Sequence, residues 1–315
     1  MKYFFIFNPG SRYGKSKHSI VAIKNLLHEK KISYDYGVTD SLNDAYELSK
    51  RANLSAYDVV VAVGGDGTIN KVLNGFYDGN GNRSSSAKLG IIYTGTSPDF
   101  CKSYNVPYHD IRKSLSALFA GKTTRIQVGK ISLMENENKS TAVTRYFSCC
   151  VNVGLGASVA RYANWGARKI AGDFAGTLLA LMKAFMHHRP RAFSISLDGK
   201  ATQLYGIVNL SVGKTFYVAS GIKVAHALAS GDGKFYVLTI RNVRWINVPY
   251  CLNVLYSGKP ILNSDTISLE YAKSIEIFDN DRKTEVEFDG DPQGLLPCRI
   301  EMTRDELELI NGPDQ

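Results

Sequence analysis

The strongest constraint on the fold is a stretch in which a strand pattern runs directly into a glycine-rich turn and then into a helix pattern. Val59–Val63 is a continuous apolar run typical of a buried strand, and apolar residues recur at helical spacing from Ile69 to Phe76. Glycines in the connection allow backbone N–H groups to approach a phosphate, and a helix N-terminus favours an anion. The alternative is an ordinary strand-to-helix turn. We interpret the connection as a phosphate cradle made of Gly64, Gly65, Asp66, Gly67 and Thr68.

A second glycine-containing segment, Asn8–Ser16, also follows a strand pattern and precedes a helix pattern. It resembles a P-loop, but the distance from Gly10 to Gly14 is one residue too short for the GxxxxGK[ST] motif. The segment also lacks the GxGxxG spacing of a Rossmann dehydrogenase. Its side chains and amides still suit a nucleotide, so it is the second candidate for a binding loop.

The distribution of strand and helix patterns predicts two domains, which is also the usual organisation for a chain of 315 residues. Up to about Thr123, short apolar runs alternate with amphipathic stretches, as in an α/β domain with a parallel, Rossmann-like sheet. Beyond it, β-rich segments predominate, interrupted by helical stretches at about 158–188 and 243–255. We therefore expect an α/β domain over residues 1–125 and a β-rich domain over residues 126–298.

Charge and cysteine usage limit the partners and the compartment. A formal net charge of +9 fits an anionic partner, which charge alone leaves open among nucleotide phosphate, nucleic acid and an acidic membrane face. The basic residues are not interleaved with aromatic ones in any recognised module, so we expect no nucleic-acid partner. The five cysteines form no CxxC pair, which favours a reducing cytoplasm. The longest apolar stretch, at about 174–186, is too short to span a bilayer and contains Lys183.

Three motifs together resemble the bacterial diacylglycerol kinases and their relatives, the sphingosine and ceramide kinases. They are Asn8–Ser11, the signature Gly64–Asn70 with its continuation to Gly75, and Thr94–Phe100. The signature alone is shared with NAD kinases and phosphofructokinases, whereas the other two motifs narrow the resemblance, which runs nearly end to end. It implies a β-sandwich in the second domain, a nucleotide in the cleft between the domains, and a tail, residues 299–315, that returns to the first domain.

The resemblance implies that the cofactors are ATP and Mg²⁺ and that two acidic residues carry the chemistry. Asp291 is the predicted general base, and Asp289 orients it or helps to hold the catalytic magnesium. Taken alone, the Asp-Gly-Asp sequence is also that of a hairpin turn, which is compatible with catalysis. The predicted ATP-binding residues are Asn8, Pro9, Gly10, Ser11, Arg12, Thr39, Gly64, Gly65, Asp66, Gly67, Thr68, Asn70, Gly95, Thr96 and Asp99.

A structural magnesium site is implied at Asp232, whose carboxylate would bind the ion together with the backbone carbonyls of Ala229 and Lys234. Without the resemblance, Asp232 reads as a β-turn residue. Two residues depart from the family pattern. Asp291 stands where a longer glutamate is usual, and Pro98 replaces an asparagine and removes a backbone N–H. These departures suggest an outlying subfamily, with a different acceptor.

The implied reaction is the transfer of the γ-phosphate of ATP to a lipid hydroxyl, with diacylglycerol, a sphingoid base, ceramide or a polyprenol as the acceptor. The segment Arg161–Arg191 carries six Lys or Arg residues against one acidic residue, which is typical of a basic helix resting on an anionic membrane. The alternative is a helix packed on the second domain with solvated charges. We expect a cytoplasmic, peripherally membrane-associated kinase of phospholipid biosynthesis that acts on a lipid at an anionic surface.

Two rival functions and the oligomeric state stay open at this point. One rival is a soluble-metabolite kinase of the NAD kinase type, against which the Asn8-Pro9 opening and the long basic stretch argue. The other is a nucleotide- or lipid-binding module with weakened catalysis, which Pro98 and the shortened Asp291 motivate. A homodimer is compatible with the sequence, which does not select an oligomeric state.

Overall fold

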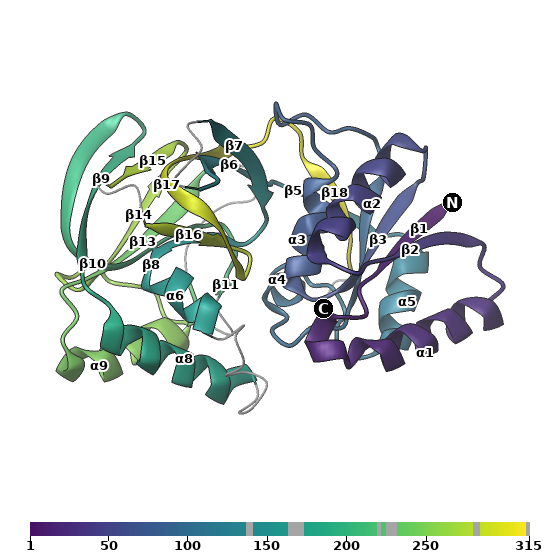
Figure 1. Cartoon of the computed structure of the whole chain (residues 1–315), viewed down its shortest axis with the longest axis horizontal. Helices are drawn as coiled ribbons and strands as arrows, with labels where there is room; N and C mark the ends of the chain where they lie inside the picture. The colour runs from purple at the N-terminus through teal and green to yellow at the C-terminus, as the bar shows by residue number, and fades with distance from the viewer. Residues whose placement is uncertain (137–140, 163–172, 219–221, 225–231, 280–283, 313–315) are drawn as a thin grey trace. The chain divides into compact units, whose positions relative to one another are not determined.

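The computed structural model describes residues 1–136, 141–162, 173–218, 222–224, 232–279 and 284–312. The chain forms two compact units (Figure 1). The first consists of Met1–Val128 and the segment that begins at Thr303, and the second consists of Gly129–Met302. The expected boundaries, at residues 125 and 298, lie a few residues before these two crossing points.

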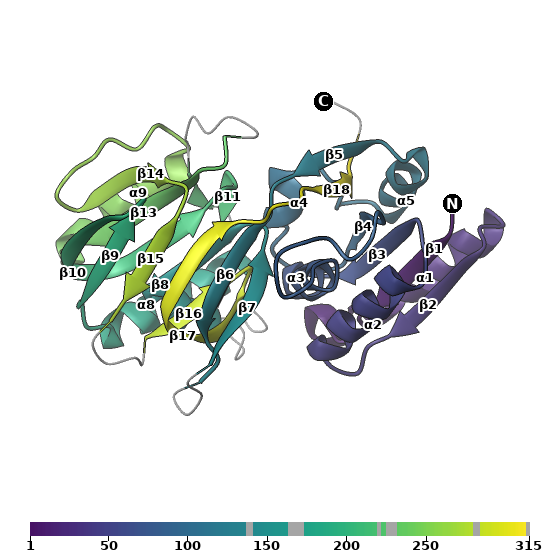
Figure 2. The same cartoon turned by 90° about the horizontal axis from the view of Figure 1, so that it is seen from above.

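The first unit is built on a mainly parallel sheet. Its strands are β1 (Tyr3–Phe7), β2 (Tyr34–Val38), β3 (Val59–Gly64), β4 (Lys88–Tyr93), β5 (Thr123–Ile126) and β18 (Leu307–Ile310). Their order in the sheet is β2-β1-β3-β4-β18-β5, so the last strand lies between β4 and β5 (Figure 2). The pairs from β2 to β18 are parallel, and β5 is antiparallel to β18. The expected α/β fold with a parallel sheet is therefore confirmed.

Helices cover both faces of this sheet. They are η1 (Ser11–Gly14), α1 (Ser16–Glu29), α2 (Leu42–Leu54), α3 (Asp66–Asn74), α4 (Asp99–Ser103) and α5 (Ile111–Ala120). Alternate residues of β1 and β3 point to one face, where they form a core with α1 and α5, whereas α2 and α3 pack together on the other face (Figure 1). Every residue of β3 is buried, as expected of a central parallel strand between two helical layers.

The second unit is β-rich, as the sequence predicts, and its main sheet is antiparallel. The strands of this unit are β6 (Gly129–Met134), β7 (Ala142–Phe147), β8 (Cys150–Gly154), β9 (Arg191–Leu197), β10 (Lys200–Gly213), β11 (Tyr217–Val218), β12 (Ile222–Lys223), β13 (Phe235–Arg241), β14 (Ile267–Ala272), β15 (Ile275–Phe278), β16 (Glu285–Phe288) and β17 (Asp291–Met302). The path of paired strands is β14-β13-β10-β8-β16-β17-β15-β9. The long strand β10 pairs with β9 through its first half and with β8 through its second half. The path from β10 to β9 therefore closes on itself.

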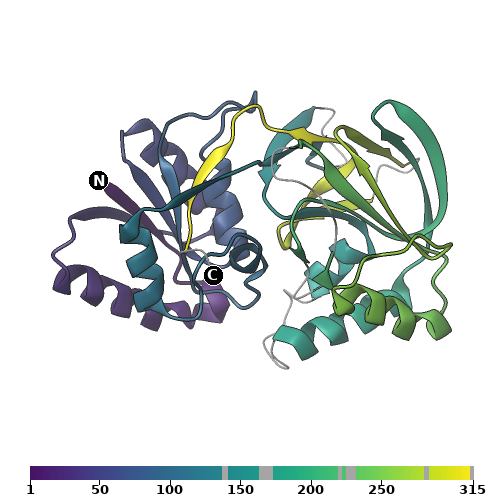
Figure 3. The same cartoon turned by 180° about the vertical axis from the view of Figure 1, so that it is seen from behind.

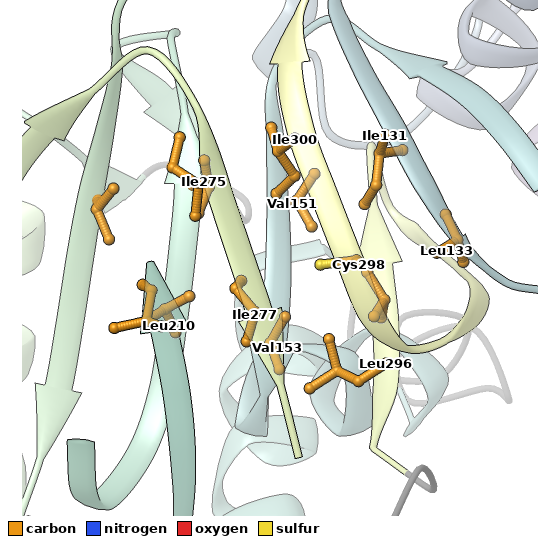
Figure 4. Packing of buried hydrophobic residues seen from close by; sticks show 14 of the residues in the cluster. Ile131, Leu133, Val151, Val153, Leu210, Ile275, Ile277, Leu296, Cys298 and Ile300 are labelled. Atoms are coloured by element: carbon orange, nitrogen blue, oxygen red, sulfur yellow. The ribbon is translucent and has the colours of Figure 1, made fainter. Parts of the chain in front are cut away.

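The core of the second unit lies inside this curled sheet. Val151 and Val153 of β8, Leu210 of β10 and Ile277 of β15 point toward one another with Ile300 of β17 (Figure 4). Each of these side chains is fully buried. Alternate residues of neighbouring strands thus supply the core, as expected of strands with one apolar face.

Helices pack on the outside of the curled sheet. They are α6 (Leu155–Tyr162), α8 (Asp173–His187), the short η3 (Trp245–Asn247) and α9 (Val248–Ser257). The sequence predicts one helical stretch over 158–188, whereas the structure has α6 and α8, and residues 163–172 between them lie outside the described residues. The two helices pack against each other through Leu155, Val159 and Leu181. Among the helices that the structure describes, none has both the length and the apolar content to cross a membrane.

Candidate active site

Three of the sequence motifs follow neighbouring parallel strands at the point where each strand ends. β3 lies between β1 and β4, and the register pairs Phe7 with Val63 and Gly64 with Tyr93. The loops after these strands therefore meet at one edge of the sheet. The direction of strand addition also reverses between β1 and β3, because β2 lies on one side of β1 and β3 on the other. Ligands of open α/β sheets bind outside the carboxyl ends of the strands at such a reversal.

Asn8 ties the first loop to the second. Its backbone N–H donates to the Val63 carbonyl at 3.0 Å, and its side-chain Nδ2 donates to Thr68 Oγ1 at 2.8 Å. Its Oδ1 accepts from the Gly10 N–H at 2.9 Å. Both ends of this buried amide thus hold the loops in place. The side chain predicted to contact ATP is a structural brace of the cradle in this structure.

Ser16 ties the first loop to the third, a role that its place at the end of the segment Asn8–Ser16 did not predict. Its buried hydroxyl donates to the Ser11 carbonyl at 2.8 Å and lies 3.1 Å from Thr94 Oγ1. Thr94 in turn donates its N–H to the Gly64 carbonyl at 2.8 Å, so all three loops are cross-linked. The available signal was a serine at the first position of a helix that follows a candidate phosphate loop.

The glycines of the second and third loops are required by space. A Cβ atom on Gly95 would lie 2.6 Å from the Cα atom of Gly65, and a Cβ atom on Gly64 would collide with the Thr68 side chain. The two loops therefore pass with their backbones in contact. Gly65 has φ −94° and ψ −171°, an extended conformation that any residue adopts. A glycine is favoured here because a side chain would come close to the other loop, and not because of the backbone torsion angles.

Helix α3 begins directly after this contact, with Gly65 as its N-cap. The first N–H groups of a helix have no partners inside the helix and point out of its N-terminus, where the helix dipole is positive. Asp66, Gly67 and Thr68 supply these groups. The arrangement can bind phosphate oxygens, as the glycine-rich sequence predicts.

Two aspartates, one in the cradle and one just after the third loop, have carboxylates that are oriented by hydrogen bonds. Asp66 Oδ2 accepts from the Tyr93 hydroxyl at 3.0 Å. Burial, followed by the negative charge of Asp66, raises the pKa of Tyr93, so this hydroxyl stays protonated and remains a donor. Asp99, the first residue of α4, is buried, and its Oδ2 accepts from the Ser97 hydroxyl at 3.3 Å.

The remaining predicted ATP contacts occupy different environments. Thr39 extends the pairing of β2 with β1 by donating its N–H to the Phe7 carbonyl at 3.0 Å. Its side chain is 2% exposed, and its Oγ1 has no hydrogen-bond partner within the described part of the chain. Arg12 lies in η1 with a left-handed backbone, φ 52°, and is exposed, whereas Asn70 is buried within α3 beside Asn74. Pro9, in the first loop, and Thr96, in the third, are half-buried.

The predicted catalytic residues lie at a turn of the second unit. β16 and β17 form a hairpin whose two-residue loop is Asp289-Gly290, with φ 49° and 97°. Positive φ at both positions is the type I′ geometry, for which Asp-Gly is a preferred sequence. Asp291 is the first residue of β17, opposite Phe288, and its side chain lies outside what the structure describes.

The carboxylate of Asp289 anchors this turn. Its Oδ2 accepts from the Ser148 N–H at 2.8 Å and from the Ser148 hydroxyl at 3.0 Å, and its Oδ1 accepts from the Cys149 N–H at 2.9 Å. Both oxygens are thus engaged with the segment that joins β7 to β8. This geometry favours the orienting role predicted for Asp289 over the binding of magnesium.

The predicted structural metal site has few ligands among the described residues. Asp232 Oδ1 accepts from the Lys234 N–H at 2.9 Å and lies 3.8 Å from Lys214 Nζ, and Ala229 lies outside the described residues. In the described ranges, no group of three or more His, Cys, Asp or Glu residues is arranged to hold a metal ion. Magnesium prefers several oxygen ligands, and Lys214 already places a positive charge near the carboxylate. Because Ala229, one of the three predicted ligands, lies outside the described residues, the magnesium site at Asp232 stays a prediction.

Two family profiles match the chain. The diacylglycerol kinase catalytic domain matches residues 2–131, and the YegS C-terminal NAD kinase beta sandwich-like domain matches residues 149–311. The first match contains the three loops that follow β1, β3 and β4. The second contains the Asp289-Gly290 turn.

Characterised relatives agree with these profiles. The chain is similar to a diacylglycerol kinase of Staphylococcus epidermidis, with 25% identity over 313 residues that cover 98% of this chain and 92% of the relative. Its structure is similar to that of a diacylglycerol kinase from Bacillus anthracis, with a TM-score of 0.69, 20% identity, and coverage of 99% and 97% of the two chains. Yeast NADH kinase, solved with NADH, is similar in fold, with a TM-score of 0.58, 11% identity, and coverage of 99% and 84%.

Proposed function

The chain belongs to the family of bacterial diacylglycerol kinases, and we propose that it transfers the γ-phosphate of ATP to a hydroxyl group of a lipid. Family membership follows from the two profiles, over residues 2–131 and 149–311. The observation that carries the proposal is the meeting of three cross-linked loops at the carboxyl ends of β1, β3 and β4. The phosphate chain of ATP binds there, against the first turn of α3.

Phosphoryl transfer asks the protein mainly for in-line positioning, for neutralisation of charge and for a base. The N–H groups of Asp66, Gly67 and Thr68 bind phosphate oxygens. The Thr39 hydroxyl, buried beside the same strand ends, is free to bond the nucleotide. Magnesium, when bound, neutralises charge on the phosphates, and Asp66 is the described carboxylate best placed to hold it, directly or through water. Without a cation or a hydroxyl as its partner, Asp66 would repel the phosphate.

The acceptor half of the reaction belongs to the turn between β16 and β17. Asp291 takes the proton of the lipid hydroxyl while that oxygen attacks the γ-phosphorus, and ADP leaves with the electrons of the broken bond. Asp289 fixes the turn through Ser148 and Cys149 and so holds the backbone of Asp291. An aspartate reaches less far than a glutamate, so this rigidity limits which acceptors the base can serve.

An exposed apolar and basic surface on the second unit supports a lipid acceptor. Helices α8 (teal) and α9 (green) both lie at the lower end of the second unit in Figure 3. Phe185 of α8 packs against Trp245 of η3, with the two ring centroids 4.6 Å apart, and α9 begins directly after η3. Exposed apolar side chains on these elements accompany exposed Lys183, Arg189 and Arg244. Aromatic and apolar side chains with a basic rim are typical of surfaces that rest on anionic membranes. The interfacial surface, as we call it, comprises Leu179, Met182, Met186, Trp245, Ile246 and Tyr250.

The proposal is tested by incubating the purified protein with γ-labelled ATP, Mg²⁺ and separate acceptors. These are diacylglycerol, a sphingoid base, ceramide and a polyprenol in anionic vesicles, with NAD as the soluble alternative. We expect label in one lipid, and we expect Asp291→Asn to lower kcat about 100-fold or more, because a general base contributes about 10²–10⁴-fold.

Asp198→Asn is the matched control. It makes the same chemical change at a different hairpin of the second unit, where Asp198 lies in the turn with φ 50° and accepts from the Lys273 N–H. We expect this variant to keep the wild-type kcat. Label in NAD alone would replace the lipid kinase with a soluble-metabolite kinase. ATP binding without transfer to any acceptor would instead indicate a nucleotide-binding module.

A further inference from the structure

A row of buried polar side chains crosses three neighbouring strands of the second unit. Glu287 of β16 lies opposite Asn152 of β8, and Asn152 lies opposite Ser211 of β10. Asn209 follows along β10, and all four side chains are buried, with Glu287 only 4% exposed. Polar groups inside a sheet core are unfavourable unless they are hydrogen-bonded, so such a row must be fully connected to persist.

Glu287 divides its two oxygens between the strand and the turn. Its Oε1 accepts from the Gly290 N–H at 2.6 Å, and its Oε2 accepts from Asn152 Nδ2 at 2.6 Å. Hydrogen bonds to a carboxylate are shorter and stronger than neutral ones. Glu287 thus holds the second residue of the Asp289-Gly290 turn, while Asp289 holds the turn from its other side through Ser148.

The row continues from Asn152 to helix α6. Asn152 Oδ1 accepts from the Ser211 hydroxyl at 2.5 Å and from Asn209 Nδ2 at 3.4 Å. Asn209 Oδ1 accepts from the N–H of Gly156, the second residue of α6, at 2.7 Å. A continuous chain of hydrogen bonds therefore runs from the first turn of α6 to Gly290.

The turn does not need this chain in order to form. Asp-Gly adopts the type I′ conformation in many hairpins without a buried carboxylate beneath it, and Asp289 already anchors it. An apolar side chain in place of Glu287 would also avoid the unfavourable burial of a charge. Glu287 adds a second anchor for the turn at the Gly290 N–H, beside the anchor that Asp289 provides through Ser148 and Cys149. Two anchors define the direction in which the next residue, Asp291, leaves the turn.

We infer that Glu287 is a positioning residue for phosphoryl transfer, which fixes the turn that carries the base and connects it through Asn152 to α6. The inference rests on the proposed function, in which Asp291 accepts the proton of the lipid hydroxyl. A displacement of about 1 Å in a catalytic group can lower the rate about 100-fold, so a loosened turn reduces the rate of transfer without weakening ATP binding.

A charge swap within the row provides the test. Glu287→Gln keeps the shape of the side chain. However, either the Gly290 N–H or the Asn152 amide then faces the NH₂ group of the glutamine in place of a carboxylate oxygen. We expect kcat for lipid phosphorylation to fall about tenfold or more, with the KM for ATP unchanged. Glu287→Gln combined with Asn152→Asp restores complementarity, because the new carboxylate on β8 accepts from the new amide on β16, whose carbonyl oxygen still accepts from the Gly290 N–H. We expect this double variant to recover most of the lost kcat.

Glu285→Gln is the control, because it removes another carboxylate from the same strand. The Glu285 side chain is half-exposed, and its carboxylate lies 2.9 Å from the Arg161 guanidinium. This variant should keep the wild-type kcat. Three outcomes overturn the inference: Glu287→Gln with the kcat of wild type, a change confined to the KM for ATP, or a double variant no faster than the single one.

Amide hydrogen exchange separates this inference from the proposed function, because it needs no activity. In glycine-labelled protein, the Gly290 N–H should exchange at least about tenfold faster in Glu287→Ala than in the wild type, as expected when a protecting hydrogen bond is lost. If the wild type transfers no phosphate, the proposed function fails whatever the exchange rates. If the wild type is active but Gly290 exchange is the same in both proteins, the positioning role fails alone.

Discussion

Gly95 and Gly65 illustrate how a binding loop can depend on the absence of a side chain. A Cβ atom on Gly95 would lie 2.6 Å from Gly65 Cα, and one on Gly65 would lie 3.2 Å from Gly95 Cα, so the second and third loops are held at backbone contact. Backbone N–H groups of both loops can then approach the same phosphate chain. The requirement is stricter at Gly95, because only there would a Cβ atom come closer than 3.0 Å to the backbone of the other loop.

Gly95→Ala should therefore weaken both nucleotide binding and the fold. Its Cβ atom would lie 2.6 Å from Gly65 Cα, and a backbone atom cannot move aside as the end of a flexible side chain can. We expect the Kd for ATP, measured by titration calorimetry, to rise about tenfold or more, with a loss of about 1–3 kcal/mol in the free energy of unfolding.

Gly79→Ala is the matched control, because nothing lies within 4 Å of the Cβ atom that it introduces. It should leave both the Kd and the unfolding midpoint unchanged. Equal losses in the two variants would show that the Gly65–Gly95 contact has no special importance. Wild-type ATP affinity in Gly95→Ala would remove this contact from the nucleotide site.

At the residue scale, the sequence identifies the loops of the candidate site. It predicts the role of each side chain in those loops less well. Asn8 belongs to the cradle, but its amide braces the loops, because a buried amide bonds whatever groups the fold brings near. Ser16 ends a segment that resembles a P-loop and Glu287 belongs to no recognisable motif, but both have partners that are distant in sequence. Their roles therefore become visible only once the strands are paired.

At the element scale, helix α8 and the short η3 show why exposure matters as much as hydrophobicity. The apolar stretch at 174–186 divides between Ala180 and Ala184, which are buried, and Leu179, Met182 and Met186, which are exposed. Helix α8 packs on the second unit and also presents exposed apolar side chains, so the predicted contact of this helix with a membrane stays a prediction. The strand patterns were easier to interpret, because burial alternates within β6 and is continuous within β3.

Ile246→Asp tests the interfacial surface. Ile246 is 82% exposed, so the change leaves the core intact while it places a negative charge where an anionic membrane would bind. We expect binding to anionic vesicles, measured by co-sedimentation, to weaken about tenfold or more, since a buried isoleucine contributes about 1.5–3 kcal/mol. The activity on a short-chain, water-soluble acceptor should stay at the wild-type level.

Leu54→Asp provides the comparison, because Leu54 is 71% exposed on the first unit, at the end of α2. It should bind vesicles like the wild type. If both substitutions weaken binding equally, general electrostatics explains the attraction, and if neither does, the surface formed by α8, η3 and α9 is not the one that meets lipid.

At the scale of the whole molecule, the two units are not two consecutive pieces of chain. The first unit is completed by β18, whose residues Leu307 and Leu309 are fully buried between β4 and β5. The predicted tail over 299–315 and the closure of the β10-to-β9 path both depend on long-range pairing. Local patterns identify such strands but cannot assign their partners, which is why the β-rich character was predictable and the curled topology was not.

Removal of the chain from Thr303 onward should unfold the first unit selectively. The truncation leaves β5 without its antiparallel partner and exposes the apolar side of β4. We expect ATP binding to be lost and amide protection to disappear from β1, β3 and β4, whereas β8, β10 and β13 stay protected. A chain that ends after Gly312 retains β18 and should bind ATP normally. Intact ATP binding without β18 would contradict this expectation.

The position of β18 also sets a constraint on biosynthesis. A ribosome completes the whole second unit before it delivers the strand that the first sheet lacks. The amino-terminal half must therefore wait, partly assembled, while the later half acquires its core. We therefore expect the first unit, although it is translated first, to complete its fold last.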